Sequence, residues 1–236
     1  FGLLIPQDTQ SADGKNKPKA WTVVPQDDAD YPFQGEYLGS KINDCHQCEP
    51  VGLQVVAMGD AKFSAVEYHG GLPGYGWPIG GDRAKYQGTR EGNVLTLTGE
   101  HQQITIKNGH SVIKSIGEYA RQVGTASFVT RQSATLGACR PCNAIALFDG
   151  TNTDLLKNGQ MTDDGLLKEG TETRDAYGDL RLHLEFRLPY MPNAVGQQRA
   201  NSGIYVQSRY EVQVLDSFGL DGAFNECGAL YREVKP

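Results

Sequence analysis

The sequence predicts an all-β protein, with a small N-terminal β domain followed by a β-sandwich. Short segments of alternating apolar and polar residues recur along the chain, and turn-forming residues separate them. Glycine supplies 29 of the 236 residues and proline 11, which favours frequent turns. Between residues 33 and 130 no segment keeps a helical period over three turns. We expect an extended arm or linker over residues 1–32, the small domain over 33–138 and the sandwich over 139–236.

The small domain is the part with the clearest strand pattern. Residues 53–57 and 63–68 flank a turn at 58–62, which predicts a hairpin. Further strands are expected at 94–98, 103–106 and 111–113, separated by turns at 91–93 and 107–109. The polar arm before this domain carries one apolar patch at 21–24, and Trp21 is a candidate for docking the arm onto the domain.

A glycine-rich segment at residues 70–78 interrupts these strands. It lacks the Lys-Ser/Thr pair of a phosphate-binding loop, and no helix is expected after it. It is interpreted as a tight surface loop with aromatic residues, and the alternative is that Tyr75 and Trp77 stack on a sugar.

The sandwich is predicted from three segments of strict alternation, at residues 180–187, 204–207 and 210–214. Their apolar faces would pack on a second sheet, and their polar faces would meet solvent or a ligand. If the segments are neighbours, several charged and amide side chains share one surface. The alternative is a solvated face laced with salt bridges. This polar surface comprises Arg181, His183, Glu185 and Arg187, then Asn201, Gly203, Tyr205 and Gln207, and finally Arg209, Glu211 and Gln213.

Five cysteines form two C-x-x-C pairs, Cys45 with Cys48 and Cys139 with Cys142, and leave Cys227 alone. The four paired residues could bind one structural zinc ion or form two disulfides, and free thiols are the third possibility. On either of the first two interpretations they connect the loop near residue 45 to the segment between the domains. Neither pair is followed by His or opens a helix in a βαβ unit, which argues against haem attachment and a thioredoxin-like role.

Charge and hydropathy exclude two classes of partner. The formal net charge of −6 disfavours nucleic acid, which normally selects a basic surface. No apolar run approaches the roughly 20 residues that a membrane-spanning helix needs.

Three motifs in the second half carry a resemblance to a known family. They are LFDG at residues 147–150, the YGD…EFR segment at 177–187 and NSGIYVQSRYEVQVLDS at 201–217. Together they resemble the 3-keto-disaccharide hydrolase domain family. The preceding β segment is similar to one found in planctomycete-type proteins of this kind, so the resemblance extends over about residues 45–236.

The resemblance implies a concanavalin-like jelly-roll sandwich, export to the periplasm or the extracellular space, and hydrolysis of glycosides oxidised at sugar C3. A 3-keto group acidifies the C2 hydrogen, so a base can remove this proton. The resulting enolate expels the C1 aglycone, and water then adds. The motifs suggest Glu211 as the base or a metal ligand, Glu185 as the reserve and His183 as a further catalytic candidate. Arg187, Asn201, Tyr205, Gln213 and Asp216 are the candidate substrate-binding residues.

The cofactor and the domain's completeness are also expectations from the resemblance. A divalent metal at the catalytic site would stabilise the enolate oxygen. Family members usually continue beyond the segment that corresponds to residues 228–231, so we expect the sandwich to be C-terminally incomplete in this chain. A further chain segment or a partner subunit would complete it. The alternative function is a non-catalytic carbohydrate-binding or structural β-sandwich module of an extracellular or cell-envelope assembly.

Overall fold

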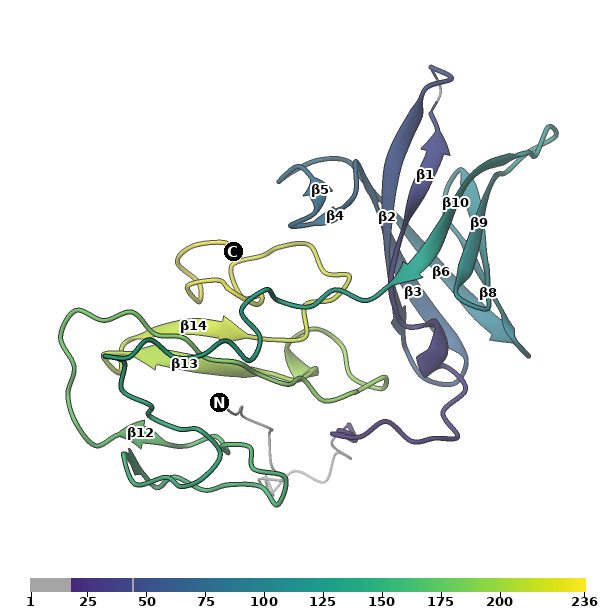
Figure 1. Cartoon of the computed structure of the whole chain (residues 1–236). Helices are drawn as coiled ribbons and strands as arrows, with labels where there is room; N and C mark the ends of the chain where they lie inside the picture. The colour runs from purple at the N-terminus through teal and green to yellow at the C-terminus, as the bar shows by residue number, and fades with distance from the viewer. Residues whose placement is uncertain (1–17, 44) are drawn as a thin grey trace.

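The computed structural model describes residues 18–43 and 45–236 and contains two parts, a closed β-barrel and a C-terminal part of short hairpins and loops (Figure 1). Residues 1–17 of the predicted arm lie outside the described residues. The elements are η1 (Tyr31–Phe33), β1 (Gly35–Ile42), β2 (Cys48–Ala57), β3 (Lys62–His69), β4 (Leu72–Pro73), β5 (Gly76–Trp77), β6 (Arg83–Glu91), β7 (Val94–Thr98), β8 (Gln102–Lys107), β9 (His110–Ser115), β10 (Gln122–Val129), β11 (Leu156–Lys157), β12 (Glu172–Thr173), η2 (Gly196–Gln198), β13 (Ser202–Val206) and β14 (Tyr210–Val214).

The barrel confirms an all-β N-terminal domain. Eight antiparallel strands follow the order β1-β10-β9-β8-β7-β6-β3-β2. The sheet is closed because β1 pairs with β10 on one side and with β2 on the other. The predicted hairpin is β2–β3, and the predicted strand at 94–98 is β7. Asn108 and Gly109 both have positive φ angles in the β8–β9 turn, as a two-residue hairpin turn requires.

The barrel core follows from the alternation of apolar side chains along each strand. On β2, Val51, Leu53 and Val55 point inward and are fully buried. Interior residues from the other strands complete one continuous cluster, which η1 extends through Phe33. This cluster extends from Phe33 in η1 to Ala126 in β10, and Tyr190 also belongs to it.

One end of the barrel interior is polar. The carboxylate of Glu67 is fully buried and forms a salt bridge with Lys41, which is 6% exposed. The Tyr86 hydroxyl donates to Oε2 of Glu67 at 3.1 Å, and Nε2 of His69 lies 3.2 Å from Oε1. The buried charge is thus both paired and hydrogen-bonded, which is the condition for keeping it in a core.

The glycine-rich segment forms a tight loop, as the sequence predicts. Leu72 and Tyr75 exchange two backbone hydrogen bonds, of 2.9 and 2.8 Å. The ring of Trp77 packs edge-on against Tyr68, with centroids 5.3 Å apart. Tyr75 remains 62% exposed at the surface.

The arm docks on the C-terminal part rather than on the barrel alone. Trp21 and Tyr190 exchange two backbone hydrogen bonds, of 3.0 and 2.8 Å, and their rings lie 6.0 Å apart. Tyr31 packs in an edge-to-face arrangement with Tyr190, with ring centroids 5.1 Å apart.

The segment at residues 180–187 corrects the sequence prediction. It is extended but forms no ladder with another described strand. The ladders within residues 143–236 are the hairpins β11–β12 and β13–β14, and Val212 of β14 also forms an isolated bridge with Leu230. Alternation favours an extended backbone, but a strand also needs a neighbour for its hydrogen bonds. Leu180, Leu182 and Phe186 consequently remain 55%, 47% and 43% exposed.

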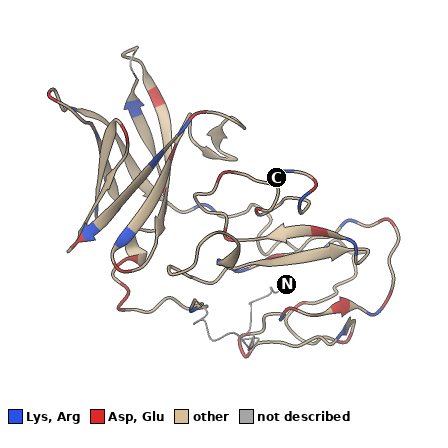
Figure 2. Cartoon of the chain, turned by 180° about the vertical axis from the view of Figure 1, so that it is seen from behind, with Lys and Arg blue, Asp and Glu red and all other residues tan. Residues whose placement is uncertain are grey.

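Lys, Arg, Asp and Glu are interspersed over both parts of the molecule (Figure 2). None of the helices in the described residues is long and apolar enough to cross a membrane.

Candidate active site

The hairpin β13–β14 places three of the predicted site residues, Tyr205, Glu211 and Gln213, on one face. Its register places Tyr205 opposite Glu211 and Gly203 opposite Gln213. Residues directly opposite in an antiparallel pair project to the same side of the sheet. The predicted shared face of these two strands is therefore present.

Tyr205 and Glu211 interact directly across this hairpin. The Tyr205 hydroxyl donates a hydrogen bond of 3.0 Å to Oε2 of Glu211. This bond, together with the charge of the carboxylate, raises the pKa of Tyr205. The phenol consequently keeps its proton and remains a donor, and its side chain is 62% exposed to any ligand on this face.

Gly203 makes room for the Glu211 carboxylate. A Cβ at position 203 would lie 2.0 Å from Oε1 of Glu211, closer than any real contact. The bare backbone thus allows the carboxylate to lie across β13 beside Tyr205. Gly203 belongs to the NSG motif, so the motif was the available signal for this role.

Asn201 and Gln213 form a second pair beside the first. Nε2 of Gln213 donates to Oδ1 of Asn201 at 2.9 Å, and Nδ2 of Asn201 donates to the carbonyl of Gln197 at 3.0 Å. Gln213 is almost fully buried at 2% exposure, whereas Asn201 is exposed. Asn201 is therefore the member of this pair that can meet a ligand.

Asp216 contacts a residue that sequence reasoning missed. Arg199 is 4% exposed, and its Nε lies 3.0 Å from Oδ2 of Asp216. Nη2 of Arg199 also donates to Oδ1 of Asp216 at 3.1 Å and to the carbonyl of Phe218 at 2.7 Å. The Asp216 carboxylate is thus engaged in holding the turn after β14. Nothing in the local pattern around Arg199 signals this role.

The remaining predicted residues lie on the extended segment before η2. Nε2 of His183 is 3.4 Å from Oε1 of Glu185, and the same oxygen accepts a hydrogen bond of 2.6 Å from the backbone of Gly137. Arg187 pairs with Asp164. A hydrogen bond from the Thr162 hydroxyl is the largest cause that lowers the pKa of Asp164, and the hydrogen bond from Arg187 is the second.

The turn of the hairpin differs from the expected face. Gln207 has a φ of 54° and Ser208 one of 52°, and both lie in the three-residue turn 207–209 between β13 and β14. The alternation expected through Gln207 ends at Val206, because the chain reverses there. Arg209 instead lies over the ring of Tyr210, at 5.4 Å.

The cysteines do not form the predicted connection. Cys45, Cys48, Cys139 and Cys142 are all free and exposed. In the β1–β10 ladder, Glu36 pairs with Val129 and Lys41 with Gly124. The β1–β2 turn therefore lies at one end of the barrel, and the chain leaves β10 at the other (Figure 1). Among the described residues, neither a zinc site nor a disulfide joins the two pairs.

A catalytic metal does not fit the residues of the hairpin face. Among the residues that the structure describes, no three His, Cys, Asp or Glu side chains come together as metal ligands. Glu211 is engaged by a phenol and Asp216 by a guanidinium, which compete with a cation for these oxygens. The chemistry of the site is accordingly derived from its side chains alone.

Comparison with known proteins identifies the C-terminal part. No curated protein and no solved structure matches the chain. A family model does match, and the match includes β11 to β14 and the site residues of the hairpin and of the extended segment, but not Gly137 or the four paired cysteines. Residues 143–236, about two fifths of the chain, match the family described as the 3-keto-alpha-glucoside-1,2-lyase-like domain, which confirms the resemblance seen in the motifs.

Proposed function

We propose that the C-terminal part cleaves 3-keto-glycosides by elimination followed by hydration, with Glu211 as the base. The observation that carries this proposal is the exposed pair of Tyr205 and Glu211, joined by a hydrogen bond of 3.0 Å. The pair lies inside the region that matches the family, whose name supports a glycoside-related function. A carboxylate that an aligned donor holds in place is a suitable general base.

The two carboxylate oxygens of Glu211 have different roles in the proposed reaction. Oε2 accepts the hydrogen bond from Tyr205, and Oε1 lies over Gly203. In the proposed reaction, Oε1 takes the proton from C2 of the sugar, and the electron pair of the C2–H bond forms the enolate. Collapse of the enolate restores the ketone at C3, forms a C1–C2 double bond and breaks the bond from C1 to the aglycone oxygen, which takes the proton from Glu211. Water then adds across the C1–C2 double bond, with its hydroxyl on C1 and its proton on C2, and the free 3-keto sugar results.

The other side chains of the site would bind and orient the sugar. Tyr205 and Asn201 are exposed on the hairpin face, and the hydroxyl oxygen of Tyr205 and the amide oxygen of Asn201 can each accept a hydrogen bond from a sugar hydroxyl. Gln213 would fix Asn201, and Arg187 would bind substrate from the extended segment. Glu185, beside His183, is the reserve base. The jelly-roll sandwich and export from the cytoplasm also belong to this proposal.

Substitution of Glu211 with Gln tests the base. The amide keeps the size of the side chain but cannot accept the C2 proton, so we expect turnover of a 3-keto-glycoside to fall about 10²- to 10⁴-fold. Glu172→Gln is the matched control, because Glu172 is an exposed carboxylate of the same part that pairs with Lys157. Turnover by Glu211→Gln at the parent rate would exclude Glu211 as the base.

Measuring binding separates catalysis from the alternative function. Calorimetry with the 3-keto-glycoside gives the affinity independently of turnover. In the proposed enzyme, Glu211→Gln binds substrate without converting it. A parent protein that binds glycosides but converts no 3-keto-glycoside would instead be a carbohydrate-binding module.

A further inference from the structure

The two C-x-x-C pairs are the most specific motif that the proposed function leaves unused. Cys45 lies in the β1–β2 turn and Cys48 begins β2, so one pair caps the end of a hairpin. Cys139 and Cys142 lie in the irregular segment after β10, where every residue from 131 to 143 is exposed. All four thiols are accessible from solvent.

Each pair has the form of half a zinc site. A C-x-x-C unit supplies two thiolates to one metal, and structural zinc takes four protein ligands in a tetrahedron. The β1–β2 turn is held by backbone hydrogen bonds from Asn43 to Gln47 and from His46 to Asn43, both of 2.9 Å. His46 has a φ of 61°, so the chain reverses sharply between the two cysteines.

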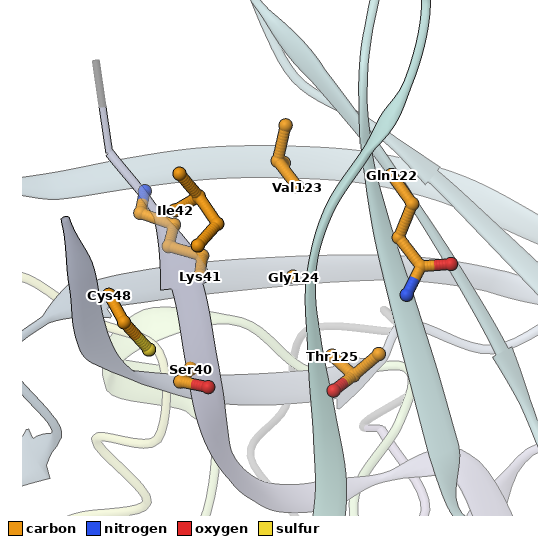
Figure 3. Close-up of a pocket in the computed structure, with 8 residues that line it drawn as sticks. All are labelled: Ser40, Lys41, Ile42, Cys48, Gln122, Val123, Gly124 and Thr125. Atoms are coloured by element: carbon orange, nitrogen blue, oxygen red, sulfur yellow. The ribbon is translucent and has the colours of Figure 1, made fainter. Parts of the chain in front are cut away.

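The surroundings of Cys48 leave its thiol outside the barrel core. Its side chain faces a shallow hollow of about 240 Å³ between β1 and β10, which Ser40 and Thr125 also line (Figure 3). Ser40 lies on the outer face of β1, since the neighbouring Lys41 points into the barrel toward Glu67. The pair is thus presented outward.

The two halves do not meet within one chain of the structure. The β1–β2 turn lies beyond one end of a ladder that runs from Glu36 to Lys41, and the chain leaves β10 at the other end, about 15 Å of strand away. Sulfurs that share one zinc ion must each lie within about 2.3 Å of it. A second copy can bring its own half site to the first without any change in the barrel.

We propose that Cys45 and Cys48 of one copy bind a zinc ion together with Cys139 and Cys142 of a second copy. The contact is head-to-tail, because the two half sites are different surfaces of the chain. Such contacts repeat and produce rings or filaments. The four thiols lose their protons when the metal binds, so no oxidant or reductant is needed.

Complementation between two variants tests this arrangement. The double variant Cys45→Ser/Cys48→Ser keeps only the pair Cys139 and Cys142. The double variant Cys139→Ser/Cys142→Ser keeps only the pair Cys45 and Cys48. All four positions are exposed, so serine should leave the fold intact, and circular dichroism of each variant checks this. The proteins are kept reduced with a phosphine, and mass and zinc content are measured by light scattering and elemental analysis.

The expected results are specific to the head-to-tail site. The parent chain assembles with one zinc per chain, and a chelator returns it to the monomer. Each double variant alone stays monomeric with zinc, and their equimolar mixture doubles in mass with one zinc per two chains. A parent monomer holding one zinc, self-association of either variant, or a parent chain that binds no zinc would each overturn the proposal.

Discussion

The backbone N–H of Gly219 donates a hydrogen bond of 3.0 Å to Oε1 of Gln54, on the outer face of β2. The same oxygen accepts a hydrogen bond of 3.0 Å from Tyr68, and Nε2 of Gln54 donates to Glu36 at 3.1 Å. One side chain therefore joins three places: β1, β3 and the turn after β14. This contact explains why outward-facing residues of β2 are buried although they point away from the barrel core.

Replacing Gln54 with Leu should loosen the C-terminal part. The leucine fills the space but leaves the Gly219 N–H and the Tyr68 hydroxyl without their acceptor, which costs about 1–3 kcal/mol. We expect this loss in the free energy of unfolding by urea, together with faster proteolysis around residues 215–222. Gln87→Leu, at an exposed position of β6, is the control. Equal proteolysis of the two variants would show that Gln54 does not hold the junction.

The barrel strands were readable from the sequence because their pattern is local. Residues 94–98 alternate between inward Leu and outward Thr, and turn residues bound them on both sides. Closure of the barrel was not readable, because it depends on β1 meeting β10 across about 90 residues. The prediction of a paired strand at 180–187 was wrong for the same reason, since alternation indicates a preference of the backbone and not the presence of a neighbouring strand.

The charged end of the barrel predicts a large cost for removing one partner. In Lys41→Met, the Glu67 carboxylate stays fully buried without its cation, and we expect a loss of about 3–5 kcal/mol in the free energy of unfolding. Denaturation by urea near neutral pH measures this.

A double variant separates charge from packing at the same end. In Lys41→Met/Glu67→Gln no charge is stranded, and the Tyr86 hydroxyl can still donate to the amide oxygen. The double variant should therefore lose less stability than the sum of the two single variants. Additive losses would mean that Lys41 and Glu67 act independently.

Two buried tyrosines predict a loss of stability in alkali. Burial raises the pKa of Tyr37 to about 12, and burial is also the main reason that the pKa of Tyr68 rises to about 12. The unfolded chain releases these protons at its ordinary tyrosine pKa of about 10, before the folded chain does. The contribution of the two protonated tyrosines to the free energy of unfolding is complete below pH 10 and is lost as the pH rises toward 12.

Unfolding by urea at pH 9 and pH 11 measures this effect. Tyr37→Phe cannot ionise, so the difference in stability between the two pH values should shrink by about 1 kcal/mol. It also loses the hydrogen bond of 2.9 Å to the Phe33 carbonyl, which lowers stability equally at both pH values. Tyr119→Phe, at an 85% exposed position, should leave the difference unchanged. An unchanged difference in Tyr37→Phe would contradict the role of this tyrosine.

In the site, as in the fold, contacts between residues close in the sequence could be predicted and contacts between distant residues could not. The pairing of Tyr205 with Glu211 follows from two alternating segments joined by a short turn, so the sequence indicated their shared face. Arg199 was missed because its partner Asp216 lies 17 residues later, beyond any periodic pattern. For the cysteines, only part of the arrangement could be predicted. The C-x-x-C spacing indicates a pair of metal ligands, but it does not indicate where the second pair lies in the fold.

Gly203→Ala tests the geometry of the candidate base without removing the base itself. The φ angle of Gly203 is not positive, so alanine fits the backbone, and the atom that its Cβ would meet at 2.0 Å is the mobile end of Glu211. The carboxylate should move away from Tyr205, while the free energy of unfolding changes by less than about 1 kcal/mol. Turnover of a 3-keto-glycoside should then fall toward the level of Glu211→Gln.

The pKa of Tyr205 gives a readout of this displacement that does not depend on activity. Its hydrogen bond to Glu211, aided by the carboxylate charge, raises the pKa of Tyr205, so losing the contact should bring that pKa down toward its ordinary value. Titration of the tyrosine ring carbons by NMR follows this residue, with Tyr205→Phe to assign its signal. Gly178→Ala is the control, because a Cβ there meets nothing within 4 Å. If Gly203→Ala leaves both turnover and the Tyr205 titration unchanged, the carboxylate does not act from its position over β13.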